Sequence, residues 1–193
     1  MSRYMLINLG AWSVPLLFTF GPFAPYYKKL GRVLAAYLTA GAAFIAWDVW
    51  ATAEGHWGFA PEHVMGVRLA GLPVEEVLFF LIIPYSSLFI LANLQHYFAD
   101  RTFSFPVSLA AVLSAGFIAA AVVFRDQAYT RTAMLACGTF FPAAAAFGRG
   151  VLGSVQFWIY MGTTYIPFLV VNYLLTSPPI VWYNPSAIWG IRV

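Results

Sequence analysis

Charged residues are scarce in this chain. Only 9% of its 193 residues are charged and 62% are hydrophobic, whereas an ordinary soluble domain has about 25% charged residues. This imbalance excludes a soluble globular domain and predicts an integral membrane protein. The net charge of +3 is small and spread over several short segments, so we expect no nucleic-acid partner.

Residue types that several common chemistries need are also missing. The one cysteine, Cys137, excludes an intrachain disulfide. Lysine occurs only at Lys28 and Lys29, so no lysine within an apolar segment is available for a retinal-type Schiff base. Residues 148–153 fit the GxGxxG pattern, but they join two apolar runs and no acidic residue follows them, which excludes a dinucleotide site. We expect no cofactor.

Long hydrophobic runs dominate what is present. A membrane-spanning helix needs about 20 mostly apolar residues, and six runs meet this length approximately. They cover residues 4–20, 33–50, 73–96, 105–124, 131–147 and 154–175. Because backbone at lipid depth must bond within helices, the sequence predicts an all-α integral membrane protein. Pro15, Pro142 and Pro167 fall inside these runs, where proline is expected to kink a helix.

A motif recurs along the chain. Residues 59–68 and 183–192 both follow the pattern aromatic-x-Pro-x-x-apolar-apolar-Gly-apolar-Arg. The shift is 124 residues, the difference between Arg68 and Arg192, and it also places Asp48 over Asn172. Several matches at one shift predict a duplication.

The duplication predicts two parallel three-helix modules joined by a linker helix. The first module covers 1–98, the linker 99–127 and the second module 128–193. The third run starts at residue 73, so the same shift carries its counterpart past Val193. We therefore expect a seventh helix that lies beyond this sequence or comes from a partner.

Two adjacent glutamates, Glu75 and Glu76, begin the third run directly after Pro73 and Val74. They favour one of two roles. Acidic residues in the first turn complement the helix dipole, worth about 0.3–1 kcal/mol. Alternatively, adjacent side chains point about 100° apart, so one glutamate can bond Arg68 while the other faces inward. An inward carboxyl in apolar surroundings would keep its proton and could serve as a general acid.

Other polar and aromatic residues gather in the same part of the sequence. Asp48 lies near the end of an apolar run, where it is either an interfacial residue or one facing the bundle interior. His56 suits a proton donor, a relay or a substrate-positioning group. With Glu54, Glu62 and His63 it matches no metal motif, so we expect no metal. The nearby aromatic residues are either packing residues or a pocket whose ring faces stabilise a cation; they are Trp47, Trp50, Trp57, Phe79 and Phe80.

The sequence resembles the membrane-type lycopene cyclase family, the small heterodimeric or fused type of bacteria, archaea and fungi. The resemblance lies in residues 46–59, in Gly66-Val67-Arg68 and in residues 71–80 with their Pro-x-Glu-Glu box. Pro178-Pro179 and residues 183–192 resemble the family's second module.

The resemblance implies redox-neutral, acid-catalysed cyclisation of the ψ end groups of lycopene to β-ionone rings through a carbocation. Lycopene would give γ-carotene and then β-carotene, so the enzyme would be an intramolecular lyase or isomerase. Glu75 or Glu76 would donate the proton, with Glu75 preferred, and the other would be its partner or the base. Asp48 and His56 would relay protons to the acid pair or support it, and the charge of Arg68 would orient the pair. The expected substrate-binding residues are Trp47, Trp50, Trp57, Phe79, Phe80, Asn172 and Arg192.

The resemblance also implies a multi-pass protein of a bacterial or archaeal cell membrane. Its partners would be lycopene or a related linear carotenoid, membrane lipid, and a second cyclase subunit or further copies of itself. Two alternatives stay open. A related cyclase would make ε rings or act on longer carotenoids. A noncatalytic membrane protein would bind lipid or carotenoid, or serve as a transporter subunit.

Overall fold

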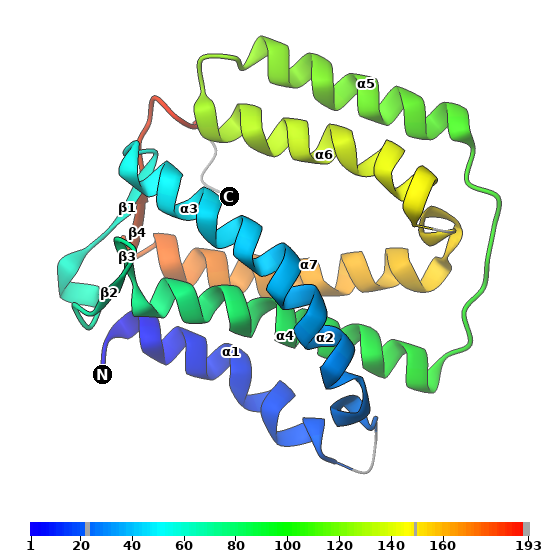
Figure 1. The fold of residues 1–193 in the computed structure, drawn as a ribbon, viewed down its shortest axis with the longest axis horizontal. Helices are drawn as coiled ribbons and strands as arrows, with labels where there is room; N and C mark the ends of the chain where they lie inside the picture. The colour runs from blue at the N-terminus through cyan, green and yellow to red at the C-terminus, as the bar shows by residue number, and fades with distance from the viewer. Residues whose placement is uncertain (22–23, 149, 191–193) are drawn as a thin grey trace.

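The chain is mostly helical (Figure 1). The structure, a computed structural model, describes residues 1–21, 24–148 and 150–190. The helices are α1 (Arg3–Thr19), α2 (Leu30–Ala36), α3 (Ala42–Ala53), α4 (Val74–Tyr97), α5 (Val107–Val123), α6 (Ala128–Phe147) and α7 (Val155–Thr176). Short 3₁₀ segments lie at Tyr26–Lys29, Pro61–His63 and Val151–Gly153, and a π segment, Tyr37–Gly41, joins α2 to α3. Each of the six predicted runs is helical.

The second predicted run is longer than expected, because helical structure continues from Tyr26 to Ala53. By length and composition, three helical stretches of the described chain can cross a membrane: Tyr26–Ala53, Val74–Tyr97 and Val155–Thr176. A shorter apolar helix is Val107–Val123. These stretches identify a multi-pass membrane protein, as the composition predicts.

Two helical groups and the separate Tyr26–Ala53 stretch make up the fold. The first packs α1 along α4 and α4 along α7, and the second is the α5–α6 hairpin (Figure 1). A close approach holds the hairpin together: a Cβ added at Gly138 would lie 2.9 Å from the Ile118 side chain. The hydroxyl of Ser114 also donates to the Gly138 carbonyl at 2.7 Å. Glycine at position 138 therefore lets the two helices touch.

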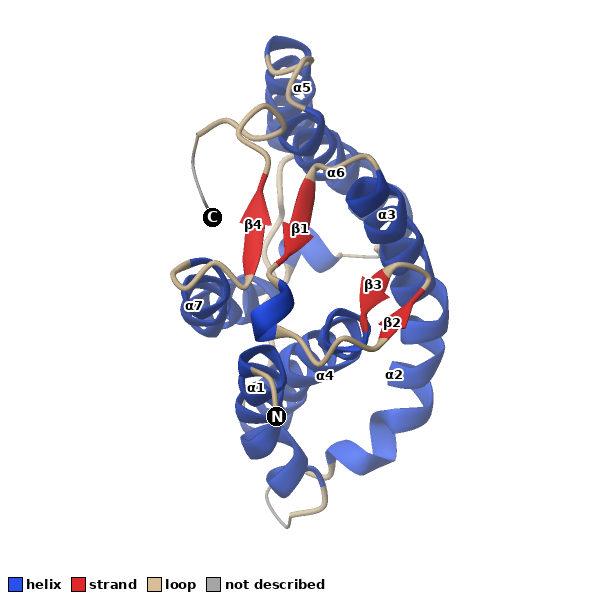
Figure 2. Cartoon of the chain, turned by 90° about the vertical axis from the view of Figure 1, so that its left-hand side faces the viewer, coloured by secondary structure: helices blue, strands red, loops and turns tan. Residues whose placement is uncertain are grey.

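Two short antiparallel ladders lie outside the helices (Figure 2). Strand β1 (Trp57–Phe59) pairs with β4 (Val181–Tyr183), and β2 (Arg68–Leu69) pairs with β3 (Leu72–Pro73). The all-α prediction is too narrow here. These segments leave their helices, their backbone groups need new partners, and aromatic residues favour strands. The β1–β4 ladder ties the first half of the chain to the second.

Asp100 fixes the beginning of α7 from the loop that follows α4. Its Oδ2 accepts a hydrogen bond from the Ser154 hydroxyl at 2.7 Å, and its Oδ1 accepts one from the Gln156 backbone N–H at 3.0 Å. Ser154 itself caps α7 by accepting from the Phe157 N–H. These hydrogen bonds, the Ser154 bond first, lower the pKa of Asp100 because they favour the ionised carboxylate.

We expect Asp100→Asn to reduce the stability of the detergent-solubilised protein at neutral pH and to weaken its acid sensitivity. Because the folded pKa is lowered, the stabilisation is present above the unfolded pKa and is lost as pH falls through the folded pKa. Thermal unfolding midpoints measured from neutral to acid pH test this. Asp126→Asn is the control, because Asp126 is 92% exposed beside Arg125. Identical pH profiles for wild type and Asp100→Asn would contradict the assignment.

Candidate active site

Glu75 and Glu76 lie in the first turn of α4, and both side chains are buried, with exposed fractions of 0% and 8%. Glu75 Oε1 accepts hydrogen bonds from the Ser2 hydroxyl at 2.6 Å and from the Met65 backbone N–H at 2.7 Å. Glu76 Oε2 accepts one from the Tyr4 hydroxyl at 2.5 Å. All three donors lie outside α4, so dipole complementation alone does not account for the pair.

The N-terminal part of α1 supplies most of this surrounding structure. Ser2 caps α1 by accepting from the Met5 N–H at 3.1 Å. Tyr4 and Asn8 are four residues apart and therefore lie on one face of α1, and both are fully buried. The Asn8 amide donates to the Glu75 carbonyl at 2.8 Å. This face of α1 thus holds the first turn of α4.

Asp48 is a third buried acid, 1% exposed on α3. Its Oδ1 accepts a hydrogen bond from Trp57 Nε1 at 2.7 Å. Asp48 Oδ2 and Glu75 Oε2 are buried and have no hydrogen-bond partner among the described residues. Asp48 is therefore an interior residue in this fold, and the interfacial alternative does not describe it.

Tyr183 of β4 connects these acids to the second half of the chain. Burial raises the pKa of Tyr183, and the neighbouring Tyr129, Glu76 and Asp48 raise it further. A negative charge has this effect on a phenol only within electrostatic reach. Glu76 and Asp48 therefore share one region with Tyr183.

Four aromatic rings pack around this region. Trp47 and Trp57 contact each other with ring centroids 5.1 Å apart, and Tyr129 of α6 lies 6.2 Å from Trp47 and 5.5 Å from Trp57. Tyr183 lies 5.7 Å from Tyr129. Trp47 and Trp57 are two of the substrate-binding residues that the resemblance implies; in the structure Trp57 donates to Asp48 and Trp47 packs on Trp57. Trp50 is different, because it is 47% exposed.

Arg68 does not reach the glutamates. Its guanidinium donates to the Gly71 carbonyl at 2.8 Å in an exposed turn. Within the described ranges the single ion pair joins Arg125 to Asp126, both exposed. The structure therefore shows no contact through which Arg68 would orient the acid pair, because the guanidinium bonds the Gly71 carbonyl within the β2–β3 turn. No described cation balances Glu75 and Glu76.

Arg68→Gln is accordingly expected to change conversion of substrate by less than about threefold, as for surface substitutions in general. Pigment chromatography from cells that express equal amounts of each variant would measure this. A loss of activity as large as that of a glutamate variant would show that Arg68 acts on the acids.

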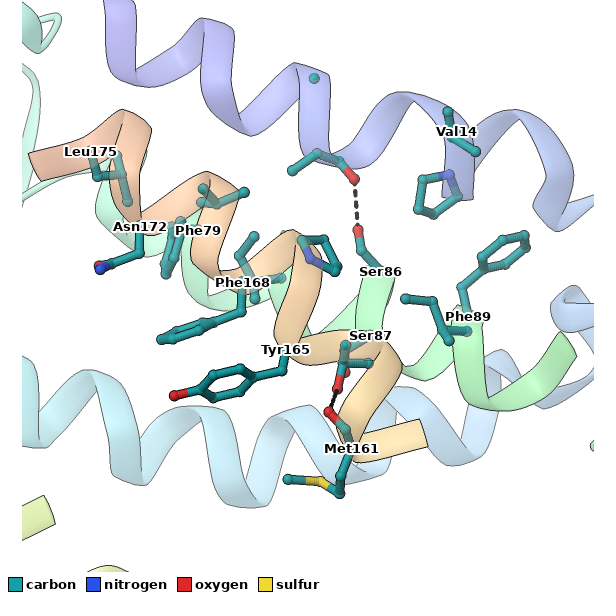
Figure 3. A pocket seen from close by; sticks show the side chains of 18 residues that line it. Val14, Phe79, Ser86, Ser87, Phe89, Met161, Tyr165, Phe168, Asn172 and Leu175 are labelled. Atoms are coloured by element: carbon teal, nitrogen blue, oxygen red, sulfur yellow. Dashed lines mark hydrogen bonds between the residues drawn. The ribbon is translucent and has the colours of Figure 1, made fainter. Parts of the chain in front are cut away.

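An apolar cavity of about 610 Å³ lies between α1, α4 and α7 (Figure 3). Leu175, Asn172 and Phe79 lie at one end of it, and Val14 and Phe89 lie at the other. The two serine hydroxyls in its wall are paired within the protein. Ser86 donates to the Ala11 carbonyl at 2.9 Å (Figure 3), and Ser87 bonds Tyr160 at 2.6 Å. The cavity therefore suits a long apolar ligand.

Phe79 connects the cavity to the acids. It lines the cavity, and its ring centroid lies 6.0 Å from that of Tyr4, the donor to Glu76. Phe79 follows Glu76 by three residues and Glu75 by four, so the three share one side of α4. The acids thus lie about one helical turn beyond the cavity end, behind the Phe79 ring.

Some of the other predicted site residues line the cavity, and the rest lie outside it. Phe79 and Asn172 line the cavity. Phe80 contacts Phe79 from outside it. The ring of His56 packs against Trp50 and Trp57, and no described contact joins it to a carboxyl group. Arg192 lies outside the described residues. Within those residues no group of three His, Cys, Asp or Glu side chains has the geometry of a metal site.

Sequence reasoning missed five residues of the site: Ser2, Tyr4, Asn8, Tyr129 and Tyr183. The first three carried a usable signal, because polar residues spaced along one face of an apolar helix predict a buried contact. The two tyrosines carried none, because the ladder that brings Tyr183 to Trp57 joins segments far apart in sequence.

The chain is similar to known carotenoid enzymes. The family model described as lycopene cyclase matches residues 2–94 and 126–193. A bifunctional lycopene cyclase/phytoene synthase from Pyrenophora tritici-repentis (strain Pt-1C-BFP) is 30% identical over 86 residues, which is 44% of this chain and 15% of that protein. The aligned part is thus a small share of that relative's length. No solved structure matches the chain.

Proposed function

Because the chain belongs to the lycopene cyclase family, we propose that it cyclises the ψ end groups of lycopene to β-ionone rings, giving γ-carotene and then β-carotene. One observation carries this proposal: a buried acid pair without a described counter-cation lies one turn from the end of an apolar cavity. A redox-neutral cyclisation needs a proton donor and an apolar cavity that binds the polyene, and these two features supply both. The enzyme would thus be an intramolecular lyase or isomerase.

Glu76 is the proton donor in this proposal. A carboxylate buried beside no cation is costly, and holding a proton removes that cost. Glu75 Oε1 already accepts two hydrogen bonds, which stabilise an anion and hold the side chain in place. Glu76 has a single described donor, Tyr4. These differences favour Glu76 over Glu75, the residue that the sequence motif favours.

The reaction conserves all atoms. The Glu76 O–H bond breaks as its proton adds to the terminal double bond of the ψ end, which leaves a tertiary cation. The electron pair of a nearby double bond closes the six-membered ring. The ring then loses a proton to the Glu76 carboxylate, either directly or by way of Glu75, and this restores the acid. Exclusion of water keeps the cation from forming an alcohol.

The polyene would occupy the cavity with its reacting end against Phe79 and Asn172. The Phe79 ring must turn aside for that end to reach the acids. Asp48 would support the site through Trp57, which donates to it. The ring faces of Trp47, Trp57, Tyr129 and Tyr183 would form an apolar, cation-tolerant wall. His56 would act only indirectly, through its contact with Trp57.

The same proposal includes two parallel modules, residues 1–98 and 128–193, joined by 99–127. Its support is a set of contacts that the 124-residue shift converts into one another. The Ala60 N–H donates to the Ile180 carbonyl at 2.9 Å, and the shift turns this bond into the Asn184 N–H to His56 carbonyl bond, also 2.9 Å. Within the β1–β4 ladder, the Trp57–Tyr183 pair becomes the Phe59–Val181 pair. A local two-fold relation between copies has this property.

Expression in cells that accumulate lycopene, followed by chromatography of their pigments, tests the function. Appearance of γ-carotene and β-carotene is expected. ε-ring products would favour a related cyclase. Unchanged lycopene beside folded protein in the membrane would overturn the proposal and favour a noncatalytic carotenoid- or lipid-binding protein. The same assay with added second cyclase subunits would show whether a partner is needed.

A further inference from the structure

The phenol of Tyr4 has an unusual place for a tyrosine at the start of a largely apolar helix, α1. Tyr4 is fully buried, and its hydroxyl donates to Glu76 Oε2 at 2.5 Å. We propose that Tyr4 is a positioning residue that sets which oxygen of Glu76 carries the acidic proton and holds the anion left after donation. This inference rests on the proposed cyclase function.

Hydrogen-bond capacity decides the position of the proton. A tyrosine hydroxyl has one proton to donate, and here it goes to Glu76 Oε2. The oxygen that accepts is then the carbonyl oxygen of a neutral carboxylic acid. The acidic proton therefore lies on Oε1, the oxygen that Tyr4 leaves free. A Glu76 without this partner would place its proton on either oxygen.

The same hydrogen bond helps after the proton has left. Donation leaves a carboxylate in a buried place that no described cation faces. A hydroxyl donor at short distance stabilises such an anion more strongly than it stabilises the neutral acid. Because this gain grows as charge develops, it lowers the barrier to proton transfer.

Packing keeps the phenol in this position. The Tyr4 ring packs on Phe79, with centroids 6.0 Å apart, and Phe79 forms the cavity end. Tyr4 itself does not line the cavity. Its removal should therefore reduce turnover of bound substrate and leave substrate binding almost unchanged.

Tyr4→Phe tests the inference because it removes the hydroxyl and keeps the ring. Assayed with lycopene in proteoliposomes, it is expected to lower kcat by at least about tenfold, since a lost transition-state donor commonly costs more, with KM within about twofold. The matched control is Tyr26→Phe. Tyr26 is 1% exposed, and its hydroxyl makes a long 3.3 Å bond to the Tyr85 carbonyl away from the acids. Wild-type kcat in Tyr4→Phe, or an equal loss in Tyr26→Phe, would overturn the inference.

A double-mutant cycle separates action through Glu76 from a packing effect. Glu76→Asp withdraws the carboxyl group from the phenol, so Tyr4→Phe should reduce kcat much less in that background than in wild type. Equal losses in both backgrounds would overturn the inference.

If Tyr4→Phe yields too little folded protein, a fluorinated tyrosine at position 4 keeps the shape and alters the donor strength. It should change kcat severalfold, and an unchanged kcat would contradict the role.

Failure of the two proposals is distinguishable. Wild-type protein that leaves lycopene unchanged refutes the cyclase function and with it the role of Tyr4. Active wild type with fully active Tyr4→Phe refutes the role of Tyr4 alone.

Discussion

Glu76→Gln is expected to abolish cyclisation of lycopene, with a loss of at least about 10²–10⁴-fold, the range attributed to a general acid. Glutamine keeps the size of the side chain and its carbonyl oxygen, so the Tyr4 hydroxyl keeps an acceptor. It has no proton acidic enough to add to an alkene. Pigment chromatography after expression in lycopene-accumulating cells measures the loss, and amounts of folded protein are compared by size-exclusion chromatography in detergent.

The burial of Glu76 without a counter-cation also predicts the thermal stability of Glu76→Gln. Glu76 is 8% exposed and faces no described cation, and glutamine, like the neutral acid of the proposal, places no charge in this buried position. The thermal midpoint of Glu76→Gln should therefore equal or exceed that of wild type. Loss of activity with retained stability would separate a chemical role from a structural one.

Two neighbouring variants sharpen the assignment. Glu75→Gln keeps an oxygen that can accept from Ser2 and Met65, so its loss should be smaller than that of Glu76→Gln. Glu62→Gln is a surface control, because Glu62 is exposed. An active Glu76→Gln beside an inactive Glu75→Gln would reverse the two roles and restore the preference that the sequence motif alone favours.

The helices of this fold were predictable because their signal is local. Runs of apolar residues of membrane-spanning length predict helices, and the predicted 73–96 and 154–175 are found at Val74–Tyr97 and Val155–Thr176. Burial of one glutamate was anticipated as one of two roles, whereas in the structure both are buried and accept hydrogen bonds from Ser2 and Tyr4.

Long-range pairing was not predictable in the same way. Trp57 and Tyr183 meet across the β1–β4 ladder although 126 positions separate them, the difference of their numbers. The repeat indicated that these segments correspond, but correspondence does not imply contact. Arg68 shows the opposite error: it is close in sequence to Glu75, yet its short turn directs the guanidinium to Gly71. Separation along the sequence was therefore a poor guide to contact at this site: distant residues meet, and neighbouring residues do not.

The cavity leads to a second large effect. Gly10 on α1 lines it, and a Cβ added there would meet nothing within 4 Å. A bulky side chain can therefore enter the cavity without strain at its base. Tryptophan also has a better helix propensity than glycine, by roughly a few tenths of a kcal/mol. Gly10→Trp should thus fill the cavity in which the polyene would bind and leave the fold unchanged.

Conversion of lycopene by Gly10→Trp is expected to fall at least about tenfold, because a tryptophan side chain covers roughly 150–250 Å² of surface that the polyene would otherwise contact. Gly116→Trp on α5 and Gly162→Trp on α7 are matched controls. Both glycines are helical, a Cβ at either would also meet nothing within 4 Å, and neither lines the cavity. Both controls should keep near wild-type conversion. Full conversion by Gly10→Trp would mean that the polyene lies elsewhere, and equal losses in all three variants would point to a general effect of tryptophan on insertion into the membrane. Loss confined to Gly10→Trp, at an unchanged thermal midpoint, would tie substrate binding to the space between α1, α4 and α7.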